Sequence, residues 1–195
     1  MTQQGTGLYR GIAGCPPPVR EALTIGERLE FTNSCAPEVG RLLYVLASHC
    51  RGRRIGEIGT GCGVGAAWMA AGMDPAARLV TVEIDLERAT AARELFRAYP
   101  AVRVVMGDWR TLGAEGPFSL LFADGGRAKL QVNGVLSLLE PGGLVVIDDL
   151  MPGGLAGDAG DSDRVRSGWF GRSDVAATEL QLTPTAAALL ATKLR

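Results

Sequence analysis

The chain has 195 residues, 47% of them hydrophobic and 21% charged, and this balance excludes disordered, collagen-like and low-complexity proteins. Its length predicts a single domain over residues 1–195, since about 150 residues is a usual domain size. Twenty basic and 21 acidic residues give a net charge of −1, which disfavours nucleic acid and anionic membranes as partners. The first residues lack the features of a signal peptide, and no apolar run approaches the roughly 20 residues of a membrane span, so we expect a cytoplasmic protein.

Residues 1–18 predict an irregular N-terminal arm that contributes nothing to the core. They carry four glycines and end in Pro16-Pro17-Pro18, a stiff polyproline turn. Apolar residues spaced by three and four from Val19 predict an amphipathic helix, and the same spacing after Pro37 predicts a second one. His49, the single histidine, lies near the end of the second helix, where we expect a packing or helix-end role.

The four cysteines are scattered along the first third of the chain, without a C-x-x-C pair. A zinc site is therefore not expected. In a protein without an export signal they are interpreted as reduced, mostly buried thiols: Cys15, Cys35, Cys50 and Cys62.

After residue 53, short apolar runs alternate with helical segments, which is typical of a parallel sheet with crossover helices. Strands are predicted near 54–58, 79–83, 102–106, 118–123 and 143–148. Helices are predicted near 64–73, 86–98 and 127–139. Pro141-Gly142-Gly143 predicts the turn before the fifth strand. The final segments 175–182 and 186–194 flank Thr183-Pro184 and predict an antiparallel pair.

A glycine-rich segment, Glu57-Ile58-Gly59-Thr60-Gly61-Cys62-Gly63-Val64-Gly65, joins the first predicted strand to the following helix. Glycines allow a tight turn and a close approach to an adenosine-type cofactor. Counting a dinucleotide motif from Gly59 places Val64 at the third small position, whereas counting from Gly61 places Ala66 there, so a nicotinamide cofactor remains an alternative. Glu57 favours a cationic ligand over a pyrophosphate, and S-adenosylmethionine (SAM) carries both a sulfonium and an ammonium group.

Two further acids follow predicted strands. Glu83, at the end of the second strand, is placed to accept the ribose hydroxyls, the alternative being a solvated strand end. Asp108, after the third strand, can accept from an adenine amino group while Trp109 flanks the ring. Alternatively, the pair is a helix cap with a packed tryptophan.

Together these residues resemble the class I SAM-dependent methyltransferases, whose motif E-x-G-x-G-x-G is present as Glu57, Gly59, Gly61 and Gly63. The likeness extends to the catechol and caffeoyl-coenzyme A type O-methyltransferases over about residues 30–195. It is carried by four further segments of the sequence, Pro37-Glu38-Val39-Gly40, Leu121-Phe122-Ala123-Asp124, residues 139–149 and residues 182–193.

This resemblance implies an α/β fold: a Rossmann-like, doubly wound, mostly parallel sheet of seven strands with an antiparallel last strand and added N-terminal helices. It also implies a homodimer and SAM as cofactor. The implied cofactor contacts, with Ser34 and Cys35 beside the methionine end, are Ser34, Cys35, Glu57, Gly59, Thr60, Gly61, Gly63, Glu83, Ile84, Asp108, Trp109 and Asp124.

The resemblance also implies a divalent cation on Asp124, Asp148 and Asp149, although members of the family commonly have asparagine at the last position. Carboxylates suit Mg²⁺, Mn²⁺ or Ca²⁺. The alternative is that Asp148 and Asp149 are caps beside an empty cleft. The family's lysine, expected three residues after the strand-four acid, is replaced by Arg127, which cannot act as a base, and Lys129 follows.

The expected reaction is in-line transfer of a methyl group to a hydroxyl of a small-molecule acceptor. Asp124 and Asp148 are the predicted catalytic residues, acting either through a metal or as a general base. The loop 150–170, with Trp169 and Phe170, is predicted either to form one wall of the acceptor site or to pack as a hydrophobic lid. Two rival functions remain, an NAD-dependent oxidoreductase using Gly61, Gly63 and Ala66 and a SAM-binding module without catalysis.

Overall fold

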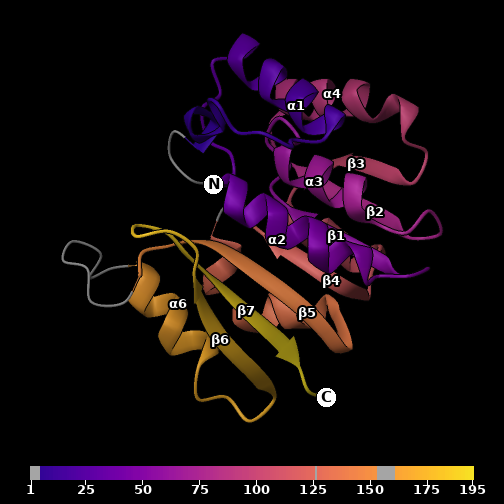
Figure 1. The fold of residues 1–195 in the computed structure, drawn as a ribbon. Coiled ribbons are helices and arrows are strands. Elements are labelled where there is room, and N and C mark those ends of the chain that lie inside the picture. Colours follow the sequence, from indigo (N-terminus) through magenta and orange to yellow (C-terminus); the bar gives the residue numbers. More distant parts are fainter. Residues whose placement is uncertain (1–4, 126, 153–160) are drawn as a thin grey trace.

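The computed structural model describes residues 5–125, 127–152 and 161–195. Its centre is a seven-stranded sheet in the order β3-β2-β1-β4-β5-β7-β6 (Figure 1). The strands are β1 (Arg54–Ile58), β2 (Arg78–Glu83), β3 (Val102–Met106), β4 (Phe118–Ala123), β5 (Leu139–Leu150), β6 (Val175–Gln181) and β7 (Ala187–Lys193). The first five strands pair in parallel, whereas β7 runs antiparallel to both β5 and β6. The predicted topology is therefore confirmed.

Helices cover both faces of the sheet because neighbouring strand residues alternate between two cores. Phe122 and Val146 pack in one core, and Leu121 and Val145 pack in the other. The helices of the first core are α1 (Pro17–Arg28), α2 (Pro37–Ser48), α3 (Val64–Gly72) and α4 (Leu86–Leu95), and those of the second are α5 (Val132–Ser137) and α6 (Asp161–Trp169). In Figure 1, α1 to α4 gather around the half of the sheet that holds β1 to β3.

Short 3-10 helices complete the architecture, and their bounds are η1 (Gly5–Tyr9), η2 (Phe96–Ala98), η3 (Trp109–Ala114) and η4 (Ala128–Leu130). The helix predicted near 86–98 is thus α4 followed by η2, and the one near 127–139 is the shorter pair η4 and α5. Among the described residues, no helix combines the length and the hydropathy that a bilayer span requires.

The prediction that the N-terminal arm contributes nothing to the core is wrong. Tyr9 and Cys15 are buried and belong to the core beneath α1 to α3. The burial of these two residues could not be predicted from the sequence, because two isolated apolar side chains among glycines and prolines make no periodic pattern. Helix α1 also begins earlier than expected, at Pro17, where the fixed φ of proline suits the first helical turn.

Strand β5 also differs from the prediction. It begins at Leu139 instead of residue 143, and the expected turn at Pro141-Gly142-Gly143 lies inside it. Gly142 has a φ of 80°, and the pairing with β4 shifts register between Phe118 and Leu120. A glycine in this conformation is typical of a β-bulge, so the signal for a turn marks an irregularity in a longer strand.

Candidate functional site

The glycine-rich segment forms the turn between β1 and α3, as predicted. Gly59, Gly61 and Gly63 all have positive φ, at 92°, 55° and 96°, which L side chains rarely adopt. Gly59 also lies against Gly125, which follows β4. A Cβ atom at Gly59 would approach within 2.5 Å of the Gly125 Cα. Glycine at both positions therefore allows the ends of β1 and β4 to meet at the site.

Glu57 lies beneath this turn and is 1% exposed. Its Oε2 accepts a hydrogen bond from the Thr81 hydroxyl, and the Ala66 N–H donates to the same carboxyl group from the first turn of α3. Burial raises the pKa of Glu57 to about 8, and the two hydrogen bonds oppose that shift. A cation placed beside this carboxyl group favours its ionised form.

The raised pKa of Glu57 makes stability depend on pH. The folded protein keeps on Glu57 a proton that the unfolded chain loses above about pH 4.5, so the contribution of Glu57 to stability is greatest below this value and falls as pH rises toward about 8. We expect Glu57→Gln to remove about 1 to 2 kcal/mol of the loss in unfolding free energy between pH 6 and pH 8. Urea denaturation at both pH values measures it, with the exposed Glu87→Gln as the control. If the unfolding free energy of Glu57→Gln depended on pH as that of the wild type does, Glu57 would not have the raised pKa.

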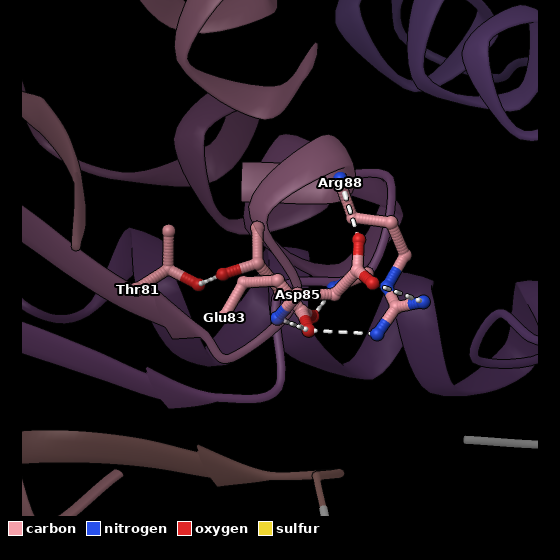
Figure 2. A network of polar contacts seen from close by, with 6 residues as sticks. Thr81, Glu83, Asp85 and Arg88 are labelled. Carbon is pink, nitrogen blue, oxygen red and sulfur yellow. Dashed lines mark hydrogen bonds and ion pairs between the residues drawn. The ribbon is translucent and has the colours of Figure 1, made fainter. Parts of the chain in front are cut away.

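Glu83 is 3% exposed and is held by three donors. Gly61 N–H donates to its Oε2 at 2.8 Å, and Asp85 N–H and the Arg88 guanidinium donate to its Oε1 at 3.0 and 2.9 Å. Figure 2 shows the carboxyl group of Glu83 between Asp85 and Arg88. Arg88 also lies over the Phe31 ring, 4.8 Å from its centroid. The predicted ribose acceptor is thus fixed to the glycine turn, with Oε2 its less engaged oxygen.

A cavity of about 330 Å³ opens beside Glu83. Five of the predicted cofactor residues line it: Gly59, Glu83, Ile84, Asp108 and Trp109. Asp108 accepts from Arg110 through both oxygens, at 3.0 and 3.1 Å, and caps η3 through the Arg110 N–H. The Trp109 ring lies against Gly134 of α5. The cap and the packed tryptophan considered as alternatives are therefore both present, and neither removes these residues from the cavity wall.

A second, narrower recess continues from Gly59. Six predicted residues line it: Ser34, Cys35, Glu57, Gly59, Thr60 and Asp124. The Thr60 hydroxyl lies 2.5 Å from that of Thr81, so Thr60 shares the hydrogen bonds beneath the loop. Two predicted contacts, Gly61 and Gly63, line neither cavity. Gly63 precedes α3 as its N-cap and packs against Leu95 and Phe96.

The three predicted metal ligands come together at the carboxyl ends of two parallel strands. Asp124 follows β4, and Asp148 and Asp149 end β5; one oxygen of each lies within 4.8 Å of the others. Successive side chains of a regular strand point to opposite faces. Here Asp149 has a φ of 64°, and the pairing of β5 with β7 shifts between Ile147 and Leu150. This irregularity brings both consecutive carboxylates to the same site.

The triad is electrostatically unfavourable by itself. Burial raises the pKa of Asp124 well above its usual value, and the two neighbouring acids raise it further. Burial and Asp149 raise the pKa of Asp148 to about 7, against the opposing effect of Lys129. The Lys129 ammonium lies 3.8 Å from Asp149 Oδ2 and 3.4 Å from its carbonyl oxygen. The position of the family's lysine holds Arg127, and Lys129 is the lysine that lies beside the acids.

Several other residues considered in the sequence lie in the core or at a helix end. Trp169 is fully buried at the end of α6 and donates from Nε1 to the Lys129 carbonyl at 3.0 Å, so it packs in the core, whereas Phe170 is 38% exposed. Residues 153–160 of the predicted acceptor loop lie outside the described residues. His49 follows α2 and its Nδ1 contacts the Val45 carbonyl, in agreement with a helix-end role. All four cysteines are free and buried.

Eight residues that line the larger cavity were not among the predicted site residues, and four of these have long polar side chains: Arg88, Arg110, Arg127 and Gln131. Arg110 reaches across to the Gln131 side chain at 3.0 Å and so closes one wall. The three arginines follow the predicted acids Glu83, Asp108 and Asp124 by five, two and three residues, and this proximity is their only signal in the sequence. Gln131 has no such signal.

Known proteins similar to this chain are methyltransferases. A family model described as a methyltransferase domain matches residues 57–150. A catechol O-methyltransferase from Mycobacterium tuberculosis is 32% identical over 164 residues, which cover 79% of this chain and 74% of that protein.

Solved structures share the fold. The O-methyltransferase TomG from Streptomyces achromogenes, involved in tomaymycin synthesis and solved in complex with SAM, is 25% identical with a TM-score of 0.79 over 99% of each chain. The O-methyltransferase from Bacillus cereus, in complex with S-adenosylhomocysteine (SAH), has a TM-score of 0.80 at 21% identity, over 97% of this chain and 96% of that one. The chain therefore belongs to the SAM-dependent O-methyltransferases.

Proposed function

We propose that this enzyme methylates a hydroxyl group of a small aromatic acceptor of the catechol type, at the carboxyl ends of β4 and β5. The observation that carries the proposal is the position of Asp124. This side chain lines the narrow recess and also belongs to the acid triad. A methyl donor in the recess and an acceptor at the triad would therefore meet at one residue, as in-line transfer requires.

The cofactor occupies both cavities in this proposal. The adenosine lies in the 330 Å³ cavity, with its ribose at Glu83 and its base between Asp108 and Trp109. The methionine end extends past Gly59 toward Ser34 and Cys35, which line the recess of about 10 Å³. Family membership supports this interpretation of the glycine turn over nicotinamide binding, because the matching proteins are methyltransferases.

The acid triad fits a divalent cation. Asp148 is 2% exposed, and within the described parts of the chain its Oδ2 has no hydrogen-bond partner, which is costly for a buried carboxylate. Three carboxylates offer the oxygen ligands that Mg²⁺ or Mn²⁺ prefers. When bound, such a cation would lower the pKa of the acceptor hydroxyl. Asp124, Asp148 and Asp149 would hold it.

The acids also provide the proton acceptor. Where no cation is bound, Asp148, with a pKa of about 7, is suited to accept the hydroxyl proton near neutral pH. The acceptor oxygen then forms its bond to the methyl carbon as the carbon–sulfur bond breaks, and SAH leaves with the sulfur's electron pair. Arg127 stays charged and takes no part as a base.

Turnover of catechol, measured as SAH formation with and without a chelator, tests the function and the metal together. We expect product with Mg²⁺ and a loss of about a hundredfold or more after treatment with EDTA, because the triad is then left without its positive charge. Equal rates in EDTA would favour a carboxylate acting alone. Tight SAH binding without methylation of any phenol in a panel would instead support a binding module without catalysis.

We further propose that the enzyme is a cytoplasmic homodimer. Four free, buried cysteines support a reducing, cytoplasmic environment. The net charge of −1 supports a small acceptor over nucleic acid or a membrane surface. Resemblance to the O-methyltransferase family supports a homodimer, and light scattering on the purified protein measures the assembly.

A further inference from the structure

The N-terminal arm packs on the segment that carries Ser34 and Cys35. Residues 31–36 form neither helix nor strand, so tertiary contacts fix their backbone. Thr6 N–H donates to the Thr32 carbonyl at 3.0 Å, and the Thr6 and Ser34 hydroxyls lie 3.0 Å apart. A Cβ at Gly5 would lie 1.8 Å from the Ser34 carbonyl oxygen. The arm is therefore fitted closely to this segment.

Tyr9 connects the same segment to the core. Its hydroxyl donates to the Cys35 carbonyl at 3.1 Å and accepts from Trp68 Nε1 at 3.0 Å. Tyr9 is 8% exposed, and Trp68, on α3, is 3% exposed. Gly40 of α2 packs against the Trp68 indole, where a Cβ would come within 2.2 Å of Nε1. The indole of Trp68 is thus fixed between α2 and α3. Because Tyr9 bonds both the indole and the Cys35 carbonyl, it fixes the backbone of Cys35 relative to these helices.

We propose that Tyr9 is a positioning residue for the cofactor's amino-acid end. Trp68 belongs to α3, which follows the glycine turn, and its indole N–H donates to the Tyr9 hydroxyl. That hydroxyl in turn donates to the carbonyl of Cys35, which lines the recess. The two sides of the recess thereby keep a fixed separation. This inference rests on the proposed placement of the methionine end beside Ser34 and Cys35.

The contacts of Tyr9 should affect the amino-acid end of the cofactor and not its adenosine. Residues 5–15 line no part of the adenosine cavity, whereas Cys35 lines the recess. Loss of the Tyr9 hydroxyl leaves the Trp68 N–H and the Cys35 carbonyl without their partner in a buried setting. The segment at 32–35 then loses one of its anchors, and a ligand with an amino-acid end must order the backbone around Cys35 on binding.

The test is the affinity of Tyr9→Phe for two ligands, measured by calorimetry. SAH has the amino-acid end, whereas 5′-methylthioadenosine has the same nucleoside without it. We expect the Kd for SAH to rise about tenfold, as expected for loss of one buried hydrogen-bonding hydroxyl, and the Kd for 5′-methylthioadenosine to stay within about twofold. A purely structural role for Tyr9 would weaken both ligands alike.

Tyr44→Phe is the matched control, because it deletes the same hydroxyl from a tyrosine that also packs on Trp68, at a ring separation of 6.4 Å, but is 40% exposed. The Kd values of Tyr44→Phe for SAH and for 5′-methylthioadenosine should equal those of the wild type. Thr6→Val, which removes the hydroxyl beside Ser34, should raise the Kd for SAH about threefold and serves if Tyr9→Phe does not fold.

Two results overturn the inference: equal weakening of both ligands, or wild-type affinity for SAH in Tyr9→Phe and Thr6→Val. Failure of the wild type to bind SAH at all would overturn the proposed function, and the inference with it. Binding of SAH by the wild type with a selective loss in Tyr9→Phe supports both.

Discussion

Replacing Asp148 by asparagine should lower kcat by about a hundredfold or more, because the variant loses a cation ligand or, where no cation is bound, the proton acceptor. In the metal-free protein, prepared with EDTA, the same replacement should be stabilising. Asp148 is 2% exposed and faces the charge of Asp149, so its ionised form is unfavourable in the folded state. Asparagine has nearly the same shape and no charge. Activity and stability are therefore expected to change in opposite directions at this position.

The stabilisation should depend on pH. The pKa of Asp148 rises from 3.8 in the unfolded chain to about 7 in the folded protein, so the cost of ionisation develops between these values and is complete above pH 7. We expect Asp148→Asn to gain about 2 kcal/mol in unfolding free energy at pH 8 and almost nothing at pH 4. Urea denaturation at both pH values provides the measurement.

Asp161→Asn is the matched control for this experiment, since the Asp161 side chain is 56% exposed on α6, pairs with Arg164 and is not part of the triad. It should leave kcat unchanged. A variant Asp148→Asn that retains wild-type turnover would remove the triad from the mechanism. One that loses stability at pH 8 would show that Asp148 has a stabilising partner.

The fold was predictable from sequence because each strand from β1 to β4 is a short apolar run bounded by a turn or a helix. Family resemblance then indicated the acids that follow β4 and end β5. The proximity of Asp148 and Asp149 was not a property of the strand pattern, which would direct consecutive side chains to opposite faces. It depends on the left-handed backbone of Asp149 and on the register shift with β7, both of which are tertiary features.

The contacts of the arm and of Arg88 were not predictable for a related reason. Tyr9 meets Cys35 and Trp68 across 26 and 59 residues of sequence, and an isolated tyrosine among glycines carries no periodic signal. Arg88 has a local partner in Asp85, but its approach to Glu83 depends on the angle at which α4 leaves β2. Polar residues that support a site from behind are thus harder to identify than the residues that line it.

Gly59→Ala should abolish measurable SAH binding and destabilise the protein by about 3 kcal/mol or more, because it combines two penalties. Alanine is strained at a φ of 92°, and its Cβ would lie 2.5 Å from the Gly125 Cα. To relieve that contact the ends of β1 and β4 must separate, which displaces the glycine turn and the backbone leading to Asp124. Calorimetric titration with SAH and thermal unfolding measure the two effects.

Gly125→Ala separates the two penalties, since it introduces the reciprocal contact, 2.6 Å from the Gly59 Cα, without a positive φ at the mutated residue. We expect it to lose SAH affinity with a smaller loss of stability. Gly113→Ala, on the exposed side of η3 with open space around its Cβ, should match the wild type in both measurements. Wild-type SAH affinity in Gly59→Ala would mean that the close approach of β1 and β4 does not shape the cofactor site, since that approach could not survive the added methyl group.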